Sequence, residues 1–422
     1  MNKETLVFQG PVFCRAGYGD HSRDLLKSLR KMDRFDIKII PMRWGNTPQN
    51  QADSTTEFGR WMLERVVTQL NVQPDVFIQV SVANEFTPVG KFNIGITAAV
   101  ETNIIPKDFI EGSNKMDLIL VPSEFTKGIM KNTGYQEQNS QTKQIIREHK
   151  ITKPIEVLFE GVDLEVFLNN RNTKTDILES VETDFNFLYV GHWLKGDLGQ
   201  DRKDVGMLIK TFTTVFKGLP KKSQPGLILK TSQSGFSITD RENIKHKINQ
   251  LIGEIGDECP PIYFIHGDLS ESEMADLYHH PKVKAMVSFT KGEGYGRPLA
   301  EFTLTGKPIL ASNWSGHLDF LPSEYSVLLN GTLNNVHPSA ADKFLMAEAK
   351  WFTVNYSEAA NKLYDVFNNY SKYLDKSKNL KTNTSNNFSL DVMHTKFVEL
   401  LDRYIKTKPK LVPINLPKLQ KI

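Results

Sequence analysis

Two glutamates that flank a glycine-rich loop are the residues of this sequence best placed to do chemistry. Glu293 and Glu301 stand within the stretch KGEGYGRPLAE. The apolar run 285–289 before the loop is typical of a buried strand, and Pro298 suits the first turn of a helix that we expect to reach about Gly306. A strand, a glycine turn and a helix N-terminus together favour anion binding, because free amides and the positive end of the helix dipole converge there.

The same two carboxylates would repel a phosphate bound at that loop. We therefore expect Glu293 and Glu301 to face another part of the ligand, such as the hydroxyl groups of a sugar or a ribose. A lone glutamate one turn into a helix, as Glu301 would be, is ordinarily a surface acid favoured by the helix dipole. Its pairing with Glu293 around three glycines favours a functional site.

A second glycine turn lies near the N-terminus. Gly17-x-Gly19-x-x-Ser22 follows the apolar run Thr5–Gln9 and precedes a stripe of leucines with helical spacing. The turn lacks the third glycine of the dinucleotide-binding fingerprint. Two interpretations remain open, a tight structural turn or a loop that contacts a ligand.

Strands that alternate with helical segments must position both loops. Repeated alternation of this kind predicts an α/β fold with two doubly wound, Rossmann-like domains, each built on a parallel sheet covered on both faces. The expected strands are Thr5–Gln9, Asp36–Ile40, Asp75–Val80, Phe92–Thr97, Asp117–Val121, Ile155–Phe159, Phe185–Val190, Gly226–Lys230, Ile262–Ile265, Ala285–Phe289, Pro308–Ala311 and Ser326–Leu329.

Composition shifts suggest where these domains begin and end. The charged, Asn/Thr-rich stretch 169–184 is predicted to be a linker between the domains, and the polar stretch 376–387 is expected to be an exposed loop. Ser389–Tyr404 has the apolar spacing of a final helix. The predicted division is an N-terminal Rossmann-like domain at 1–168, a linker at 169–184, a C-terminal Rossmann-like domain at 185–385, a helix at 386–405 that packs back on the N-terminal domain, and a basic tail at 406–422.

The totals exclude several classes of protein. A chain of 422 residues exceeds one ordinary core, which favours two domains. A net charge of +3 is small for this length and does not indicate a nucleic-acid-binding surface. Cys14 and Cys259 suit neither a disulfide framework nor a zinc cluster, so the cytoplasm is the simplest compartment. We see no signal-peptide core, and no run approaches the roughly 18 apolar residues of a membrane span.

The glutamate pair and several shorter motifs resemble the GT-B glycosyltransferases, most closely the retaining enzymes of glycosyltransferase family 4. The segment from Glu293 to Glu301 is similar to that family's Glu-x7-Glu signature. The other motifs agree in order and spacing: Glu160-Gly-Val-Asp163 with Phe167, Val190-Gly-His-Trp193, Asp201-Arg-Lys-Asp-Val205 and Gly306-Lys-Pro-Ile-Leu-Ala311. The resemblance covers nearly the whole chain and implies two Rossmann-like domains that face each other across a cleft.

This resemblance implies transfer of a sugar from a UDP- or GDP-linked donor, with retained anomeric configuration and without a metal or other cofactor. It gives catalytic roles to four residues. Arg202 and Lys203 would neutralise the leaving diphosphate, Glu293 would hold the sugar, and Glu101 would contact the acceptor or the reacting sugar. The donor-binding residues that it implies are Gly17, Gly19, His192, Lys230, Gly294, Tyr295, Gly296, Arg297 and Glu301, with Glu301 on the ribose.

One motif departs from the family pattern. Many family members have Gly-Arg where this chain has Gly191-His192. A histidine can donate a hydrogen bond to phosphate, but it needs a raised pKa to act as a cation near neutral pH. Lys195 or Lys230 would then supply the missing charge.

Three other classes of function were weighed. A GT-B-shaped sugar-nucleotide epimerase would need a carboxylate and histidine set on the N-terminal side, and we find no clear one in the sequence. An oxidoreductase is disfavoured by the incomplete glycine turn. A non-catalytic sugar-nucleotide-binding protein would not need Glu293, Glu301 and Lys203 together. The acceptor stays open among polysaccharide, lipid, protein and modified nucleic acid.

Overall fold

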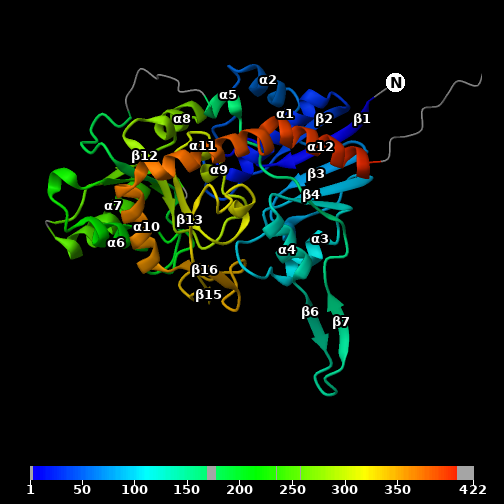
Figure 1. The fold of residues 1–422 in the computed structure, drawn as a ribbon. Coiled ribbons are helices and arrows are strands. Elements are labelled where there is room, and N and C mark those ends of the chain that lie inside the picture. The colour runs from blue at the N-terminus through cyan, green and yellow to red at the C-terminus, as the bar shows by residue number, and fades with distance from the viewer. Residues whose placement is uncertain (1–2, 169–176, 234, 257, 406–422) are drawn as a thin grey trace, which may run out of the picture.

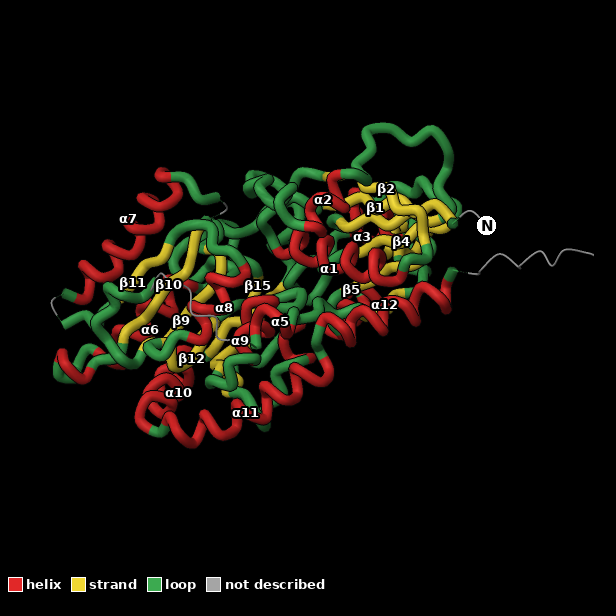
Figure 2. The backbone as a smooth tube through the Cα atoms, turned by 90° about the horizontal axis from the view of Figure 1, so that it is seen from above, coloured by secondary structure: helices red, strands yellow, loops and turns green. Residues whose placement is uncertain are grey.

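The structure, a computed structural model, describes residues 3–168, 177–233, 235–256 and 258–405. Two parallel six-stranded sheets lie side by side, each with helices packed on it (Figures 1 and 2). We call the part built on the first sheet the first lobe and the part built on the second sheet the second lobe. The sequence-predicted fold of two doubly wound α/β units is confirmed.

The first sheet has the strand order β2-β1-β3-β4-β5-β8, and every neighbouring pair is parallel. Its strands are β1 (Glu4–Gly10), β2 (Phe35–Pro41), β3 (Val76–Val80), β4 (Phe92–Ile96), β5 (Leu118–Val121) and β8 (Ile155–Val157). The helices of this lobe are α1 (Gly17–Met32), α2 (Glu57–Leu63), α3 (Lys107–Ser113), α4 (Glu124–Asn132) and α5 (Leu164–Phe167).

The second sheet has the order β11-β10-β9-β12-β13-β14, again parallel throughout. Its strands are β9 (Asn186–His192), β10 (Gly226–Ser232), β11 (Ile262–Ile265), β12 (Val283–Ser288), β13 (Ile309–Ser312) and β14 (Val327–Leu329). Its helices are α6 (Val205–Phe216), α7 (Ile238–Ile255), α8 (Glu271–His279), α9 (Arg297–Thr303), α10 (Tyr356–Asn368) and α11 (Tyr370–Asn387). Each strand expected from the sequence overlaps one strand of these two sheets.

Both sheets are covered on both faces, as parallel sheets require. Successive residues of β1 divide between the two sides: Leu6 and Phe8 pack toward α1, and Val7 packs toward α3 and α4. The second sheet divides in the same way, with α6, α7 and α10 on one face and α8, α9 and α11 on the other. The near-continuous apolar runs in the sequence are therefore strands buried on two sides.

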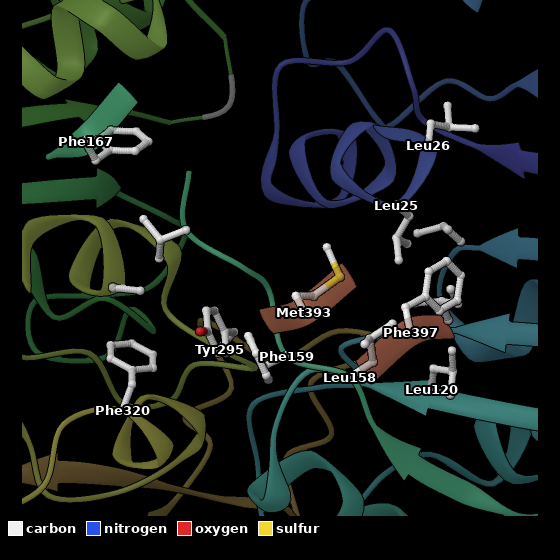
Figure 3. Packing of buried hydrophobic residues seen from close by; sticks show 14 of the residues in the cluster. Leu25, Leu26, Leu120, Leu158, Phe159, Phe167, Tyr295, Phe320, Met393 and Phe397 are labelled. Carbon is white, nitrogen blue, oxygen red and sulfur yellow. The ribbon is translucent and has the colours of Figure 1, made fainter. Parts of the chain in front are cut away.

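The chain ends on the first lobe. Helix α12 (Leu390–Tyr404) packs against α1, and Met393 and Phe397 join the apolar cluster that contains Leu25 and Leu26 (Figure 3). Tyr404 donates a 2.7 Å hydrogen bond to Glu156. Helices α11 and α12 thus run from the second lobe to the first along one side of both (Figure 2).

Two expectations about local structure were wrong or incomplete. The stretch 376–387, expected as an exposed loop, is the second half of α11. Two antiparallel hairpins were not foreseen, β6 (Tyr135–Gln138) with β7 (Ile145–His149) and β15 (Gly331–Asn335) with β16 (Lys350–Val354). The predicted domain boundaries stay a prediction, and part of the 169–184 linker and all of the 406–422 tail lie outside the described residues. No described helix is long and apolar enough to cross a membrane.

Candidate active site

One cleft of about 480 Å³ lies where strands of both sheets end. It is lined by the last residues of five strands, Val80, Ile96, His192, Ser232 and Ser288. Parallel α/β sheets bind ligands at this edge. Apart from Gly19 and Lys195, the residues predicted from the sequence line the cleft: Gly17, Glu101, His192, Arg202, Lys203, Lys230, Glu293, Gly294, Tyr295, Gly296, Arg297 and Glu301. Lys195 lies outside the lining and pairs with Asp342 at 3.2 Å.

Four charged groups from three loops meet in the cleft. Lys203 forms an ion pair with Glu293. Arg202 Nη1 lies 3.1 Å from Glu101 Oε1 and 3.7 Å from Glu293 Oε2. Burial works against ionisation of Glu293, but Lys203 and Arg202 outweigh it and lower the pKa of Glu293 to about 2. Glu293 is therefore ionised at neutral pH and is held by two cations.

The loop that carries Arg202 and Lys203 is held by contacts with buried residues of the second lobe. The backbone N–H of Lys291 donates a 2.7 Å hydrogen bond to the Arg202 carbonyl. Lys291 Nζ lies 3.1 Å from Asp204 Oδ2, and both charged side chains are buried. Asp204 has φ 54° and is the residue before α6, so the two cations stand at that helix's N-terminus. An ion pair in the second-lobe core thus fixes the direction in which the loop projects.

The glycine loop is held by both lobes. In the second lobe, Ser315 Oγ accepts a 2.9 Å hydrogen bond from the Glu293 amide. In the first lobe, Ser123 Oγ donates a 2.6 Å hydrogen bond to the Gly294 carbonyl. Gly296 has φ 99°, a conformation that strains any residue with a Cβ, and it is the residue before α9. The predicted strand, glycine turn and helix are confirmed in their order.

Glu301 is deeper than a surface acid. It accepts a 3.0 Å hydrogen bond from Arg297 Nε and a 3.1 Å hydrogen bond from the Tyr278 hydroxyl. Burial raises the pKa of Glu301, and Arg297 opposes this effect. A carboxylate has about four lone-pair positions, so two remain for ribose hydroxyls. Arg297 also reaches Asp24 in the first lobe, at 2.7 Å.

His192 is placed as expected but differs in charge. Its Nδ1 lies 3.2 Å from Ser232 Oγ. Burial, followed by the nearby cations of Lys203, Lys230 and Arg202, lowers the pKa of His192 to about 4. Among these residues the imidazole is neutral at pH 7. Lys230, whose pKa burial lowers to about 8, keeps most of its charge at neutral pH and donates to the Gly267 carbonyl at 2.9 Å.

The two glycines of the N-terminal turn have different roles. Gly17 begins α1 and lines the cleft, and no atom lies within 4 Å of a Cβ added there. Gly19 does not line the cleft. A Cβ on Gly19 would lie 2.2 Å from the Cys14 carbonyl oxygen, so that glycine permits close backbone packing. The structural interpretation of the turn holds at Gly19, and contact of Gly17 with a ligand stays a prediction.

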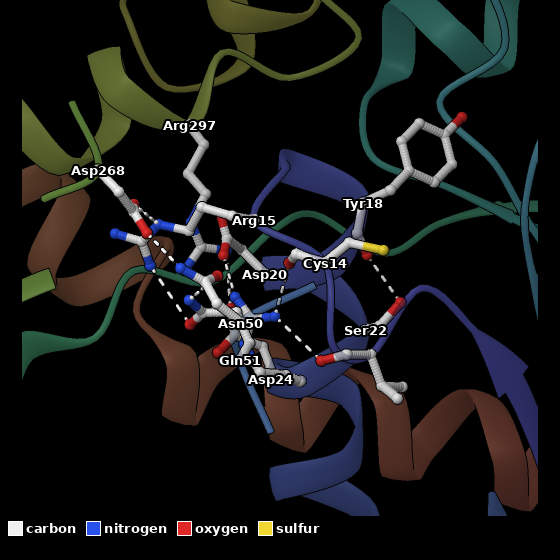
Figure 4. A network of polar contacts seen from close by, with 12 residues as sticks. Cys14, Arg15, Tyr18, Asp20, Ser22, Asp24, Asn50, Gln51, Asp268 and Arg297 are labelled. Carbon is white, nitrogen blue, oxygen red and sulfur yellow. Dashed lines mark hydrogen bonds and ion pairs between the residues drawn. The ribbon is translucent and has the colours of Figure 1, made fainter. Parts of the chain in front are cut away.

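Other cleft residues were not singled out from the sequence. Arg15, from the same turn as Gly17, lies 2.8 Å from Asp268 of the second lobe, and Asn50 donates a 2.7 Å hydrogen bond to that aspartate (Figure 4). Glu160 also lines the cleft, and burial raises its pKa to about 8. In the sequence, Arg15 lies close to the glycine turn and Glu160 begins one of the short motifs. Only the fold shows that both residues line the cleft.

Comparison with solved structures decides the architecture. A glycosyltransferase from Rickettsia africae matches 97% of this chain and all of its own length, with a TM-score of 0.63 and 14% identity. HepE from Anabaena, solved with UDP and glucose, matches 95% of this chain and all of its own length, with a TM-score of 0.61 and 13% sequence identity. This chain has the GT-B fold. Sucrose-phosphate synthase from Thermosynechococcus elongatus also matches, with a TM-score of 0.60 and 12% sequence identity. The match covers 95% of this chain and 99% of the length of that enzyme.

HepE has also been solved with UDP-glucose, but at these identities the neighbours establish the fold and not the reaction. No protein-family model and no curated protein matches the sequence. The expected GT-B architecture is thus confirmed, while the roles of individual residues rest on the geometry of the cleft.

Proposed function

We propose that this protein is a retaining glycosyltransferase of the family 4 type, which transfers a sugar from a nucleotide-sugar donor to an acceptor hydroxyl. The observation that carries the proposal is the cluster of Lys203, Arg202, Glu293 and Glu101 in a GT-B cleft. It offers cations for a diphosphate and carboxylates for sugar hydroxyls within a few ångströms of each other.

The residue roles follow from the chemistry of transfer. The bond between the sugar C1 and the diphosphate oxygen breaks, and its electron pair leaves with the diphosphate. Arg202, Lys203 and the N-terminus of α6 stabilise that charge. The acceptor oxygen bonds to the same face of C1, and its proton passes to the departing diphosphate. Glu293 orients the sugar, Glu101 contacts the reacting sugar or the acceptor, and Glu301 holds the ribose.

The remaining assignments follow from the same proposal. The donor is UDP- or GDP-linked and lies on residues 185–385, and residues 1–168 with the helix at 386–405 form the acceptor side. The phosphate charge is met by Arg202, Lys203 and Lys230, which supports a reaction without a metal ion. Two free cysteines, Cys14 and Cys259, suit a cytoplasmic location.

Nucleotide release from a panel of UDP- and GDP-sugars tests the proposal. We expect one donor to be hydrolysed slowly without an acceptor, and Lys203→Ala and Glu293→Gln to lower that rate by about 100-fold, because each removes a charge partner of the transition state. Lys210→Ala is the matched control, since Lys210 lies on α6 and pairs with Glu254 on the surface.

Two results would overturn the proposal. One is that neither variant changes turnover by more than about threefold, a change too small for loss of a transition-state charge partner. The other is conversion of the donor to an isomer without nucleotide release, which would indicate an epimerase.

A further inference from the structure

An aromatic pair on the first-lobe side of the cleft is not among the residues assigned to donor binding. Tyr18 of α1 and Trp44, which follows β2, stack with ring centroids 4.1 Å apart and planes inclined by 23°. Both side chains line the cleft. The Tyr18 hydroxyl accepts a 2.8 Å hydrogen bond from the Ala98 amide and lies 3.3 Å from Thr97 Oγ1. Tyr18 is thus fixed at both ends, by the helix and by the loop after β4, and it supports Trp44.

The pair lies beside the loop that carries Glu293. Ala98, which holds the Tyr18 hydroxyl, packs closely against Gly294: a Cβ added at Gly294 would lie 2.9 Å from Ala98 Cβ. Glu101 follows in the same loop and reaches Arg202. Tyr18 points away from the charged network of Arg15 and Asp268 on the other side of its turn (Figure 4). A ring stacked on the pair would therefore lie next to the sugar-binding glutamate and apart from that network.

Polar groups without partners accompany the pair. The Tyr295 hydroxyl and His21 Nδ1 are buried and have no hydrogen-bond partner among the described residues, and both residues line the cleft. Both atoms have almost no accessible surface, so a ligand in the cleft reaches them only if neighbouring side chains move. Glu160 lines the cleft as well, and its charge acts on both Tyr18 and Tyr295.

The charge of the cleft indicates what the pair would bind. Seven acidic side chains and five lysine or arginine side chains line it, and burial raises the pKa of Glu160 to about 8 and that of Glu301 to about 7. The lining is therefore close to neutral at pH 7, and a bound diphosphate donor makes it negative. An acceptor that carries phosphates would meet repulsion there. An uncharged pyranose ring would not, and its C–H bonds carry the partial positive charge that suits the negative face of an indole ring.

We propose that Tyr18 and Trp44 form the acceptor subsite and that the acceptor is an uncharged saccharide, whose ring stacks on Trp44 and whose hydroxyls bond to Glu160. This inference rests on the proposed glycosyl transfer for its reaction, but not for its binding geometry. The saccharide hydroxyl nearest Glu293 receives the sugar.

The test uses the full chain, the donor found by the nucleotide-release panel, and the methyl glycosides of glucose, galactose, mannose and N-acetylglucosamine as probes. We expect transfer to at least one glycoside. Trp44→Ala should lower the ratio of transfer to donor hydrolysis by at least about tenfold, and Trp44→Phe, which keeps an aromatic face, by less than about threefold. Trp61→Ala is the control, because Trp61 stacks on Phe58 in the same lobe outside the cleft lining, and the ratio should not change.

Binding is measured separately, by saturation-transfer NMR of the same glycosides with UDP present, in the wild type and in Trp44→Ala. Binding that depends on Trp44 without any nucleotide release would refute the proposed transfer and leave the subsite standing. Three results would overturn the subsite itself: no glycoside binds the wild type, Trp44→Ala lowers transfer and hydrolysis equally, or transfer occurs to a hydroxymethylated oligonucleotide or to glycerol phosphate but to no neutral glycoside.

Discussion

The buried pair of Lys291 and Asp204 allows a quantitative test of how the cationic loop is held. Lys291 Nζ lies 3.1 Å from Asp204 Oδ2 and 3.1 Å from Thr353 Oγ1, and the two charged side chains are 1% and 0% exposed. Tyr356 donates a 2.8 Å hydrogen bond to the same aspartate oxygen. Lys291→Met keeps most of the apolar side chain but leaves a buried carboxylate with the Tyr356 hydroxyl as its side-chain partner.

Removing one partner of a buried ion pair costs about 3–5 kcal/mol, because the other charge stays buried. A domain has only about 5–15 kcal/mol of stability, so the variant should lose a large share of it. With a urea m value of about 2.5 kcal/mol/M, the unfolding midpoint should fall by about 1.2–2 M. Equilibrium urea unfolding followed by circular dichroism measures the shift.

Two further variants separate charge from packing. Tyr356→Phe removes one hydrogen bond but keeps the ion pair, and we expect a loss of about 1–2 kcal/mol. Lys291→Met combined with Asp204→Asn removes both charges and should recover at least about 1 kcal/mol relative to Lys291→Met alone. The reasoning is refuted if Lys291→Met costs less than Tyr356→Phe, or if the double variant is less stable than the single one.

Two other predictions concern α1. Gly19→Ala should destabilise the protein by about 1–3 kcal/mol, because its Cβ would lie 2.2 Å from the Cys14 carbonyl oxygen. The Cβ of Gly17→Ala meets open space, so this variant should not lower the melting temperature. Equal melting temperatures of the two variants would contradict the packing argument. His21, only 6% exposed, has its pKa lowered by burial from 6.5 to about 4, so the unfolded chain takes up the proton first as the pH falls. The contribution of neutral His21 to stability is complete above pH 6.5 and is lost as the pH falls toward 4. His21→Gln should therefore reduce the loss of unfolding free energy between pH 7 and pH 4.5 by roughly 2–3 kcal/mol. Urea unfolding at both pH values measures this difference.

The sheets were predictable because most of their strands are short, mainly apolar runs, as burial on both faces favours. Helix α11 was not predictable from composition. Its second half is rich in Asn, Lys and Thr, which favour loops in isolation, yet Ser377, Leu380 and Thr384 lie on one stripe and are buried where the helix packs near α9. Tertiary packing overrides weak helix propensity at these positions.

The charged part of the site was predictable because parallel strands bring loops distant in sequence to one edge. Arg202, Lys203 and Glu293 meet for that reason. The protonation of His192 was not predictable, since it depends on burial beside Arg202 and Lys203 of one loop and Lys230 of β10. Trp44 could not be placed either, because it lies between β2 and α2 with no periodic pattern to give its direction.

The charges of the cleft also limit the ligands that it can hold. Lys203 pairs with Glu293 and Arg202 lies 3.1 Å from Glu101, so these four groups sum to zero. A free phosphate would gain little from the two cations, because it would meet the two carboxylates as well. A nucleotide sugar offers phosphate oxygens to the cations and hydroxyl donors to the carboxylates at once. The pairing of acids with cations therefore selects a ligand that carries both groups at a fixed separation, and it gives a physical reason for glutamates in an anion-binding loop.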